Sequence, residues 1–272
     1  MSDTTVSRGA RWLHALAGAE AQDSGPVRHA DAELGGETSR FITVVPDPDN
    51  RFPQARDNVV GLEQGWRLAQ PVRSAMAADA SSATRRPIIA IVDVKSQAYG
   101  YREEMLGIHL ACAAAVDAYA SARLAGHPVI ALIVGPAMSG AFLAHGYQAS
   151  RIVALDAAGT MVHAMGREAA ARVTRRSVED LDALGETIVP MSYSMTSFGK
   201  LGLLDQLIEG VDADAPSDEQ TARVRDVLAH MVREARAQPR DLSHRLRNDA
   251  ATRTRTASIE VRRRLAQQWN AD

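Results

Sequence analysis

A chain of 272 residues with 46% apolar and 24% charged residues is typical of a globular protein with a sizeable core. Its net charge of -2 gives no basic excess, so we do not expect nucleic-acid binding. Residues 1–5 lack the start of a signal peptide, and the most apolar segment, 129–134, is too short to span a membrane. The single cysteine, Cys112, excludes an intramolecular disulfide and favours a cytoplasmic location. Its alanine-rich surroundings predict a small buried side chain rather than a nucleophile.

The N-terminal part is predicted to begin with a short helix at 11–17. A polar loop is expected from Gly25-Pro26 to Gly35-Gly36, since glycine and proline mark turns. The β-branched run at 41–45 predicts a strand. A helix over 61–77 follows, in which Pro71 is a candidate break.

The middle of the chain alternates strands and helices. Continuous apolar runs at 88–92 and 129–134 predict strands that are covered on both faces. Between them, apolar residues at helical spacing predict one helix over 103–124, and Gly126 follows its end. The shorter predicted elements are a tight loop at 135–139, a helix beginning at 140, and strands at 151–155 and within 159–164. This alternation indicates an α/β class.

The C-terminal part contains an amphipathic helix at 218–236. Ser217 and Gln220 have the spacing of a capping box at its start. The apolar stripe from Val224 to Ala235 is a candidate interface element. Without a fixed repeat or a linker, we expect a single domain over 1–272, with an N-terminal extension at about 1–40 and a helical tail at about 237–272.

Two loops leave a buried strand and enter a helix, at 93–100 and at 135–141. Backbone N–H groups at such turns lack partners within the helix, and two converging ones can hold a developing oxyanion. Ser139, Gly140 and Ala141 are small enough for a carbonyl group to approach the backbone. Ordinary tight turns in an α/β sheet would show the same pattern.

Both loops resemble segments of a known superfamily. Asp93 to Gly107 resembles the carboxyltransferase run D-T-P-G-A-Y-P-G with its following E-E and G, and Gly135 to Ala141 resembles the crotonase segment G-x-A-x-G-G-G. Residues 8–13 and 49–56 resemble the N-terminal runs of malonate decarboxylase gamma subunits. The resemblance extends from about residue 8 to residue 235. It implies a crotonase-like (ClpP/crotonase) α/β fold of repeated ββα units with helical extensions.

The same resemblance implies the site residues. The superfamily's second oxyanion donor falls on Gly140, where Ser139 and Ala141 replace the outer glycines. The first donor falls near Ser96 and Gln97, where carboxyltransferases have Gly-Ala. The implied catalytic residues are therefore Gly140, Ser139, Gln97 and Ser96. The implied substrate-binding residues are Met138, Tyr99, Gly100 and Lys95. Lys95 replaces a proline, and a solvated loop lysine is the alternative reading of that residue.

The implied activity belongs to the gamma subunit of malonate decarboxylase. With a homologous crotonase-like beta subunit, it would convert malonyl thioester on an acyl carrier protein to acetyl thioester and CO2. The thioester would ride on a phosphopantetheine-type group of the carrier protein, so no cofactor is expected on this chain. An enolate stabilised by oxyanion donors needs no metal, in keeping with the lack of an H-E-x-x-H or G-x-S-x-G motif. His145 and His163 are candidate proton donors or structural histidines.

Two alternatives remain open. One is the carboxyltransferase half of a biotin-dependent carboxylase or decarboxylase, whose biotin would lie on another chain because no Met-Lys-Met signature occurs here. The other is a non-catalytic subunit that stabilises its partner, which the serines at Ser96 and Ser139 favour. The eight arginines from Arg240 to Arg264 form either a docking face for an acidic carrier protein or a solvated helix face.

Overall fold

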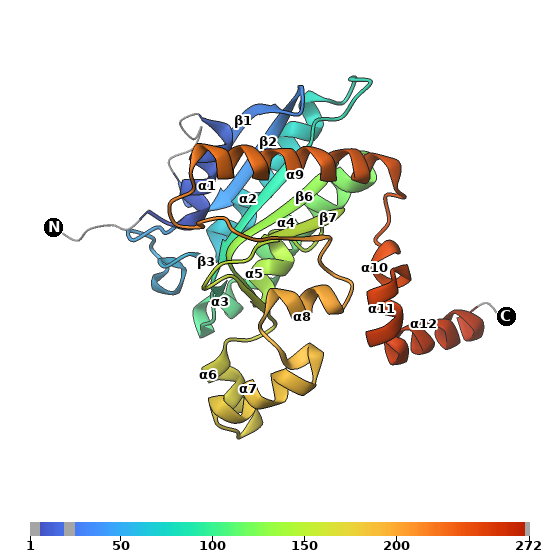
Figure 1. Cartoon of the computed structure of the whole chain (residues 1–272). Coiled ribbons are helices and arrows are strands. Elements are labelled where there is room, and N and C mark those ends of the chain that lie inside the picture. Colours follow the sequence, from blue (N-terminus) through green and yellow to red (C-terminus); the bar gives the residue numbers. More distant parts are fainter. Residues whose placement is uncertain (1–5, 19–24, 270–272) are drawn as a thin grey trace.

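The computed structural model describes residues 6–18 and 25–269, and is built around a seven-stranded sheet (Figure 1). The strand order is β1-β2-β4-β6-β7-β9, with β8 paired to β6. These strands are β1 (Val27–Leu34), β2 (Glu37–Val44), β4 (Ile88–Val94), β6 (Val129–Met138), β7 (Arg151–Leu155), β8 (Met161–His163) and β9 (Gln206–Ile208). Only β1 and β2 pair antiparallel. The short strands β3 (Val59–Val60) and β5 (Ser96–Gln97) form a second, parallel sheet.

Helices cover both faces of the large sheet, with α9 crossing one face in Figure 1. One face packs against α1 (Arg8–Ala17) and α9 (Asp218–Ala237), and the other against α2 (Leu62–Ala78), α4 (Ile108–Leu124), α5 (Ser139–Ala144) and α8 (Met195–Lys200). Successive side chains of β2 point to opposite faces of the sheet. Phe41 packs in the same cluster as Trp12 of α1, and Ile42 packs in the same cluster as Leu68 of α2. This double covering explains why β4 and β6 are almost continuously apolar.

The remaining helices are short or peripheral, and η1 (Pro53–Ala55) among them packs against α2 and α4 through buried Ala55. The others are α3 (Tyr101–Met105), α6 (Arg167–Thr174), α7 (Val178–Thr187), η2 (Val189–Met191), α10 (His244–Arg247), α11 (Asp249–Thr254) and α12 (Thr256–Trp269). In Figure 1, α6 and α7 form a lobe below the sheet, and α10–α12 form a projecting tail. Arg245 attaches this tail by donating to the carbonyl groups of Tyr147 and Ala149 at 2.8 and 2.6 Å.

The predicted loop over residues 25–36 is wrong, because most of it forms β1. This strand lies at the edge of the sheet and carries polar side chains between buried Val27, Ala30 and Leu34, so its alternation is irregular. Gly35 and Gly36 have φ of 63° and 87° and form the hairpin turn to β2. Two successive residues of positive φ are what a tight hairpin turn demands.

The predicted helix over 103–124 consists of two helices, α3 and α4. Gly107, with φ of 82°, lies between them. The predicted tight loop at 135–139 is also wrong, because Pro136 to Met138 continue β6 and pair with β8. By contrast, α2 continues through Pro71 without a break. The strands predicted at 41–45, 88–92 and 151–155 are confirmed.

The capping box of Ser217 and Gln220 is confirmed at the start of α9. The apolar stripe of this helix is core rather than interface, because Val224, Leu228 and Met231 are buried against the sheet. Cys112 is half-buried, and burial raises the pKa of its thiol to about 11, so it stays protonated. In the described residues, no helix is both long and apolar enough to cross a bilayer. Residues 1–5, where no signal peptide was predicted, lie outside the described residues.

Candidate active site

The two segments predicted as site loops, 93–100 and 135–141, meet at the carboxyl ends of β4 and β6; we keep the names first loop and second loop for them. These strands pair in parallel, and Val94 is opposite Ala137 at the end of the ladder. The backbone N–H of Gln97 donates a hydrogen bond to Oγ of Ser139 at 3.0 Å. The structure therefore brings Gln97 from the first loop next to Ser139 from the second.

The first loop is held by the small sheet of β3 and β5. The N–H of Lys95 donates to the carbonyl of Asn58 at 3.0 Å, and that of Ala98 donates to the carbonyl of Val60 at 2.9 Å. The Ser96 hydroxyl donates to the carbonyl of Gln97 at 2.6 Å. The N–H of Gln97 in turn reaches the second loop through Oγ of Ser139.

Lys95 lies at the exposed side of the first loop. Its Nζ atom is 2.8 Å from a carboxylate oxygen of Asp57, and both side chains are at least half exposed. An ion pair of this kind contributes little stability. The contact favours the reading of Lys95 as a solvated loop lysine.

Ser139 has an unusual backbone conformation, with φ of 52°. This left-handed region is easily adopted by glycine and costs energy for other residues, which explains why glycine suits this position in the family's motif. The hydrogen bond from Gln97 helps to hold Ser139 in place. Because a hydroxyl both accepts and donates, Oγ can accept from Gln97 and still donate its own proton to a substrate oxygen.

Gly140 follows in the first turn of α5, where a backbone N–H has no intrahelical acceptor. The side-chain amide of Gln97 packs directly on its Cα. A Cβ atom at Gly140 would lie 1.7 Å from Oε1 of Gln97, well inside the closest approach of real atoms. Only glycine fits here unless the Gln97 side chain moves.

A cleft of about 310 Å³ opens beside Ser139 and Gly140. Its lining is mainly apolar. The other lining residues are Phe142, Leu143, Tyr147, Val162, His163, Ala164, Pro190, Ser192, Phe198, Leu201 and Leu203. The ring of Phe142 meets the rings of Tyr147 and Phe198 edge-on, with centroids 5.5 and 6.2 Å apart. The wall from residues 190–203 was missed in the sequence, because that segment carries no motif.

His163 supplies the imidazole in the cleft lining. Its ring stacks on Tyr193 with centroids 4.0 Å apart, and Arg167 lies over the Tyr193 ring at 4.3 Å. Nδ1 of His163 lies 3.0 Å from the carbonyl oxygen and 3.2 Å from the backbone nitrogen of Met165, so either neutral tautomer has a partner. Burial is the main cause that lowers the pKa of His163, and Arg167 lowers it further. The imidazole is therefore neutral near pH 7.

His145 has a structural role instead. It is fully buried, with Nδ1 3.0 Å from the Tyr119 hydroxyl and Nε2 2.9 Å from the carbonyl oxygen of Ile91. Burial lowers its pKa to about 4. Both ring nitrogens are engaged in the core, so His145 has no nitrogen left for a substrate in the cleft.

The other predicted substrate-binding residues lie outside the cleft lining. Met138 is buried at the end of β6, Gly100 precedes α3, and Tyr99 is exposed. Their contacts with substrate stay a prediction. Across residues 6–18 and 25–269, no group of His, Cys, Asp and Glu side chains is arranged to hold a metal ion.

A layered α/β sheet with two strand-to-helix turns meeting at its carboxyl edge is the arrangement expected of a crotonase-like fold. The chain is similar to transcarboxylase 12S, with a TM-score of 0.59 and 18% identity over 79% of this chain and 36% of that chain. This likeness confirms the predicted fold. The sequence model of the family described as "Malonate decarboxylase gamma subunit" matches residues 55–269, and the chain belongs to that family. It is a subunit of malonate decarboxylase.

Full-length similarity supports this assignment. A chain of a Pseudomonas malonate decarboxylase hetero-tetramer, in complex with coenzyme A, is 53% identical over 97% of this chain and 100% of that chain, with a TM-score of 0.90. The malonyl-S-ACP:biotin-protein carboxyltransferase MADD of Malonomonas rubra is 36% identical over 167 residues. That match covers 60% of this chain and 57% of the relative, so it spans little more than half of the relative's length.

Proposed function

We propose that this chain supplies an oxyanion-binding wall for decarboxylation of a malonyl thioester. The observation that carries the proposal is the hydrogen bond from Gln97 to Ser139 beside Gly140, at the mouth of an apolar cleft. The Gly140 N–H and the Ser139 hydroxyl are the two donors, and the Gln97 N–H orients that hydroxyl. A water-poor, apolar surrounding strengthens such donors.

The chemistry needs charge stabilisation more than a nucleophile. The bond between the carboxylate carbon and the α-carbon breaks, CO2 leaves, and the electron pair moves onto the thioester oxygen as an enolate. Donors that bind this oxygen more tightly as its charge grows lower the barrier. A proton then goes to the α-carbon and gives acetyl thioester. His163 lines the cleft as a neutral imidazole, and we propose that it relays this proton: one ring nitrogen gives its N–H proton to the α-carbon while the other takes a proton from water.

The cleft fits a thioester arm better than a free dicarboxylate, because its lining is mostly apolar. We propose that the substrate is carried on the phosphopantetheine-type group of an acyl carrier protein, with no cofactor held by this chain. The Pseudomonas relative binds coenzyme A, whose thiol arm has the same chemistry. The single, protonated cysteine suits a reducing cytoplasm, which we propose as the location.

We propose that a homologous beta subunit covers an apolar surface around α3. This surface, which we call the α3 patch, consists of exposed Tyr99, Tyr101, Met105, Leu106 and Leu110. It directly follows the first site loop in the chain, and the relative occurs as a hetero-tetramer, so a partner subunit is available to cover such a surface. Exposed apolar surface of this kind marks protein interfaces.

Paired substitutions test the α3 patch. Tyr101→Asp combined with Leu106→Asp should separate the co-expressed subunits in size-exclusion chromatography with light scattering. Val173→Asp, an exposed apolar position on α6, is the matched control and should leave the complex intact. An intact complex with the double variant would place the interface elsewhere.

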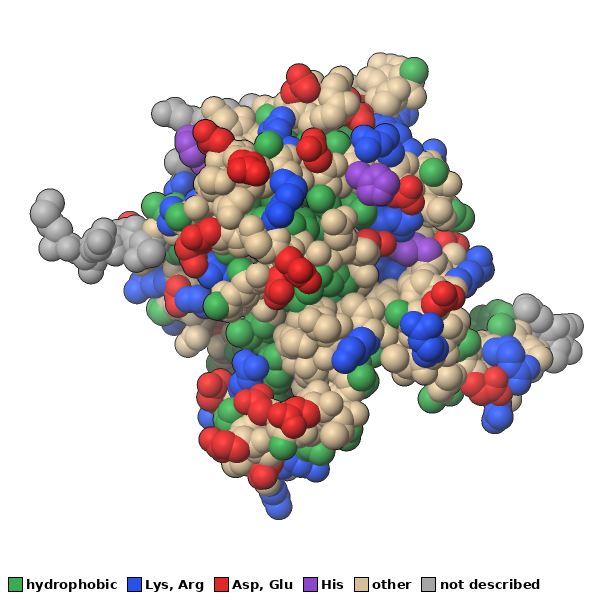
Figure 2. Space-filling model, viewed as in Figure 1, with side chains coloured by type: hydrophobic (Ala, Val, Ile, Leu, Met, Phe, Trp, Pro, Cys, Tyr) green, Lys and Arg blue, Asp and Glu red, His purple; other side chains and the backbone are tan. Residues whose placement is uncertain are grey.

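We propose that the acidic carrier protein docks on the basic tail. Figure 2 shows Lys and Arg side chains on the tail at the right, whereas Asp and Glu side chains gather over the α6–α7 lobe. Arg263 and Arg264 pair with Glu260, so they are partly neutralised. We therefore assign the docking to Arg253 and Arg262. Both lie in the helical tail of about 237–272, which we propose belongs to a single domain together with the N-terminal extension of about 1–40. Arg253→Glu with Arg262→Glu should raise KM for the carrier thioester, and an unchanged KM would exclude the tail.

The central experiment removes the Ser139 hydroxyl. Ser139→Ala in the reconstituted complex should lower turnover roughly a hundred- to a thousand-fold, as expected for the loss of one oxyanion donor. Ser139→Gly restores an easy left-handed backbone but lacks the hydroxyl, so it should be equally slow. Ser121→Ala, on α4 near the opposite edge of the sheet, is the control. Near-normal turnover of both Ser139 variants would favour the non-catalytic, stabilising role.

A biotin-dependent carboxyl transfer is the second candidate, because it is the activity in the name of the Malonomonas relative. The two functions differ in the fate of the carboxyl group. In the reconstituted complex, release of CO2 without any biotinyl protein supports decarboxylation. Transfer of labelled carboxyl to an added biotinyl protein, with no release in its absence, supports the alternative.

A further inference from the structure

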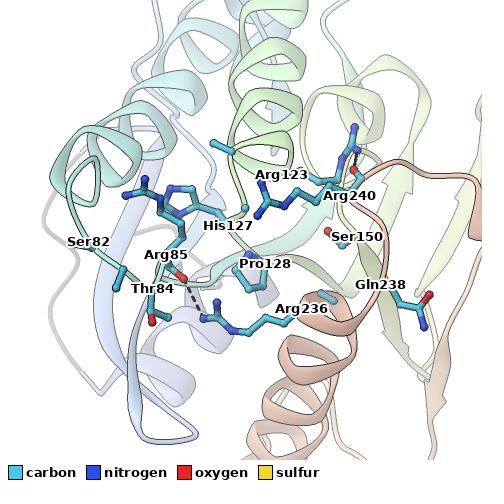
Figure 3. A pocket seen from close by; sticks show the side chains of 14 residues that line it. Ser82, Thr84, Arg85, Arg123, His127, Pro128, Ser150, Arg236, Gln238 and Arg240 are labelled. Carbon is cyan, nitrogen blue, oxygen red and sulfur yellow. Dashed lines mark hydrogen bonds between the residues drawn. The ribbon is translucent and has the colours of Figure 1, made fainter.

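A second cavity, of about 470 Å³, lies at the opposite edge of the sheet from the cleft. Pro128 and Ser150, which directly precede β6 and β7, are part of its lining, so it faces the amino ends of these strands. Figure 3 shows Arg123, Arg236 and Arg240 around Pro128, with Arg85 beside His127. The arginines are Arg85, Arg123, Arg236 and Arg240. They come from the loop after α2, the end of α4, the end of α9 and the segment that follows it.

The positive charge of this cavity is largely uncompensated. Arg236 pairs with Glu37, whereas within the described part of the chain no carboxylate forms an ion pair with Arg85, Arg123 or Arg240. Their hydrogen bonds go to carbonyl oxygens instead, which satisfy N–H groups without neutralising the charge. Arg85 donates to Ala80 at 3.1 Å and Arg240 donates to Leu124 at 3.1 Å.

Two observations indicate that a ligand belongs here. Nη1 of Arg85 is buried and has no hydrogen-bond partner among the described residues, which is costly for a charged donor. Arg123 is 8% exposed, and burial lowers the pKa of its guanidinium. The negative charge of Asp241 raises that pKa, but by less than burial lowers it. A buried cation without a counter-ion is unfavourable, and a bound anion would remove that cost.

Of the acidic groups nearby, Asp79 is neutralised by an arginine outside the cavity, whereas Asp241 keeps its charge and offsets one of the four arginines. Asp241 accepts hydrogen bonds from the hydroxyl and the N–H of Ser243 at 2.7 and 3.1 Å. Asp79 is paired with Arg86 at 2.7 Å. His127, which also lines the cavity, has Nδ1 2.9 Å from the carbonyl oxygen of Arg86, and burial lowers its pKa. The cavity therefore keeps its net positive charge.

We propose that this cavity binds a small phosphate-bearing anion, such as a phosphomonoester or a diphosphate. The planar guanidinium groups of Arg85, Arg123 and Arg240 match the oxygen geometry of a phosphoryl group, and several of them fit a multiply charged ligand. The volume suits a small molecule rather than a single chloride ion. The site lies at the far edge of the sheet from Ser139, so this proposal does not depend on the proposed function.

Calorimetric titration of the purified complex in a chloride buffer tests the site. Inorganic phosphate and pyrophosphate are the probes, and malonate is the non-phosphate dianion for comparison. We expect saturable binding at one site per chain, strongest for pyrophosphate. Arg85→Gln combined with Arg240→Gln should weaken it by at least about tenfold, the equivalent of one lost charge-assisted hydrogen bond. Arg172→Gln, an exposed arginine on α6, is the matched control.

Three results would overturn the proposal. Non-saturable binding, or equal binding by the double variant, would show that these arginines hold no phosphate. Equal affinity for malonate and pyrophosphate, lost for both ligands in the double variant, would make the cavity a general dianion site. Binding to the free chain but not to the complex would mean that a partner subunit fills the cavity, with an acidic segment as its occupant. Thermal melting of the double variant checks that it is folded.

Discussion

Gly140→Ala separates the effect of donor access from the effect of packing. The new methyl group would lie 1.7 Å from Oε1 and 2.9 Å from Cδ of Gln97, so the side-chain amide must rotate away. Cβ of Gln97, at 3.8 Å, can stay in ordinary contact. The backbone N–H of Gly140 is kept, while the methyl group and the displaced amide of Gln97 narrow the space beside it.

The expected cost to stability is small. A strained Gln97 rotamer costs about 0.5–1.5 kcal/mol. Alanine is favoured over glycine inside a helix by about 1 kcal/mol, which offsets most of that cost. We therefore expect Tm to change by less than about 4 °C. Blocking one oxyanion donor, by contrast, costs about 2.7–4 kcal/mol of transition-state stabilisation, or a hundred- to a thousand-fold in turnover.

The assay is CO2 release by the reconstituted complex, with Tm and complex mass measured on the same samples. The double variant Gln97→Ala/Gly140→Ala removes the displaced amide but keeps the methyl group. If the methyl group blocks the donor, the double variant stays as slow as Gly140→Ala. If the collision alone were responsible, it would match Gln97→Ala. Turnover of Gly140→Ala within threefold of the wild type, in an intact complex, would refute the placement of Gly140 at the oxyanion.

Three further predictions concern other parts of the chain. His163→Gln should reduce turnover by about a hundred-fold or more with little change in KM, as measured by steady-state kinetics, if this imidazole delivers the proton. The pKa of His145 is about 4 in the fold, against 6.5 normally, so the unfolded chain binds its proton first as the pH falls. Stability should therefore decline from pH 6.5 to 4 by about 3 kcal/mol through this group, and urea unfolding of His145→Gln should show a shallower decline. Arg245→Ala removes two bonds from a charged donor, so the tail should be cleaved faster in limited proteolysis, whereas Arg247→Ala should behave like the wild type.

The central strands could be predicted from the sequence because their burial leaves a pattern within a few consecutive residues. Strands β4 and β6 are buried on both faces and therefore appear as continuous apolar runs. The edge strand β1 escaped prediction because its outer face is polar and its two turn glycines resemble a loop. The break at Gly107 was missed because helical spacing continues across it, and only the left-handed φ of that residue ends the first helix.

The candidate site was predictable only in part, for a similar reason. The loops that carry Gln97 and Ser139 follow buried strands and could be located, but the bond between them depends on the register of β4 against β6. The second wall of the cleft contains Pro190 and Phe198. It could not be predicted, because only the packing of the folded chain brings that segment next to Ser139 and Gly140. The assignment of His163 rather than His145 to the cleft depended on burial, which the sequence does not display.

The projecting helix α12 has a consequence for how the protein must be made. Val261, Leu265 and Trp269 recur every four residues, so they lie on one side of this helix, and all three are exposed, Trp269 to 89%. A newly synthesised copy without its beta subunit thus presents both this apolar stripe and the α3 patch to chaperones, proteases and other copies of itself. We expect the chain to be short-lived or aggregation-prone when produced alone, so that balanced synthesis of the subunits sets how much enzyme a cell can accumulate.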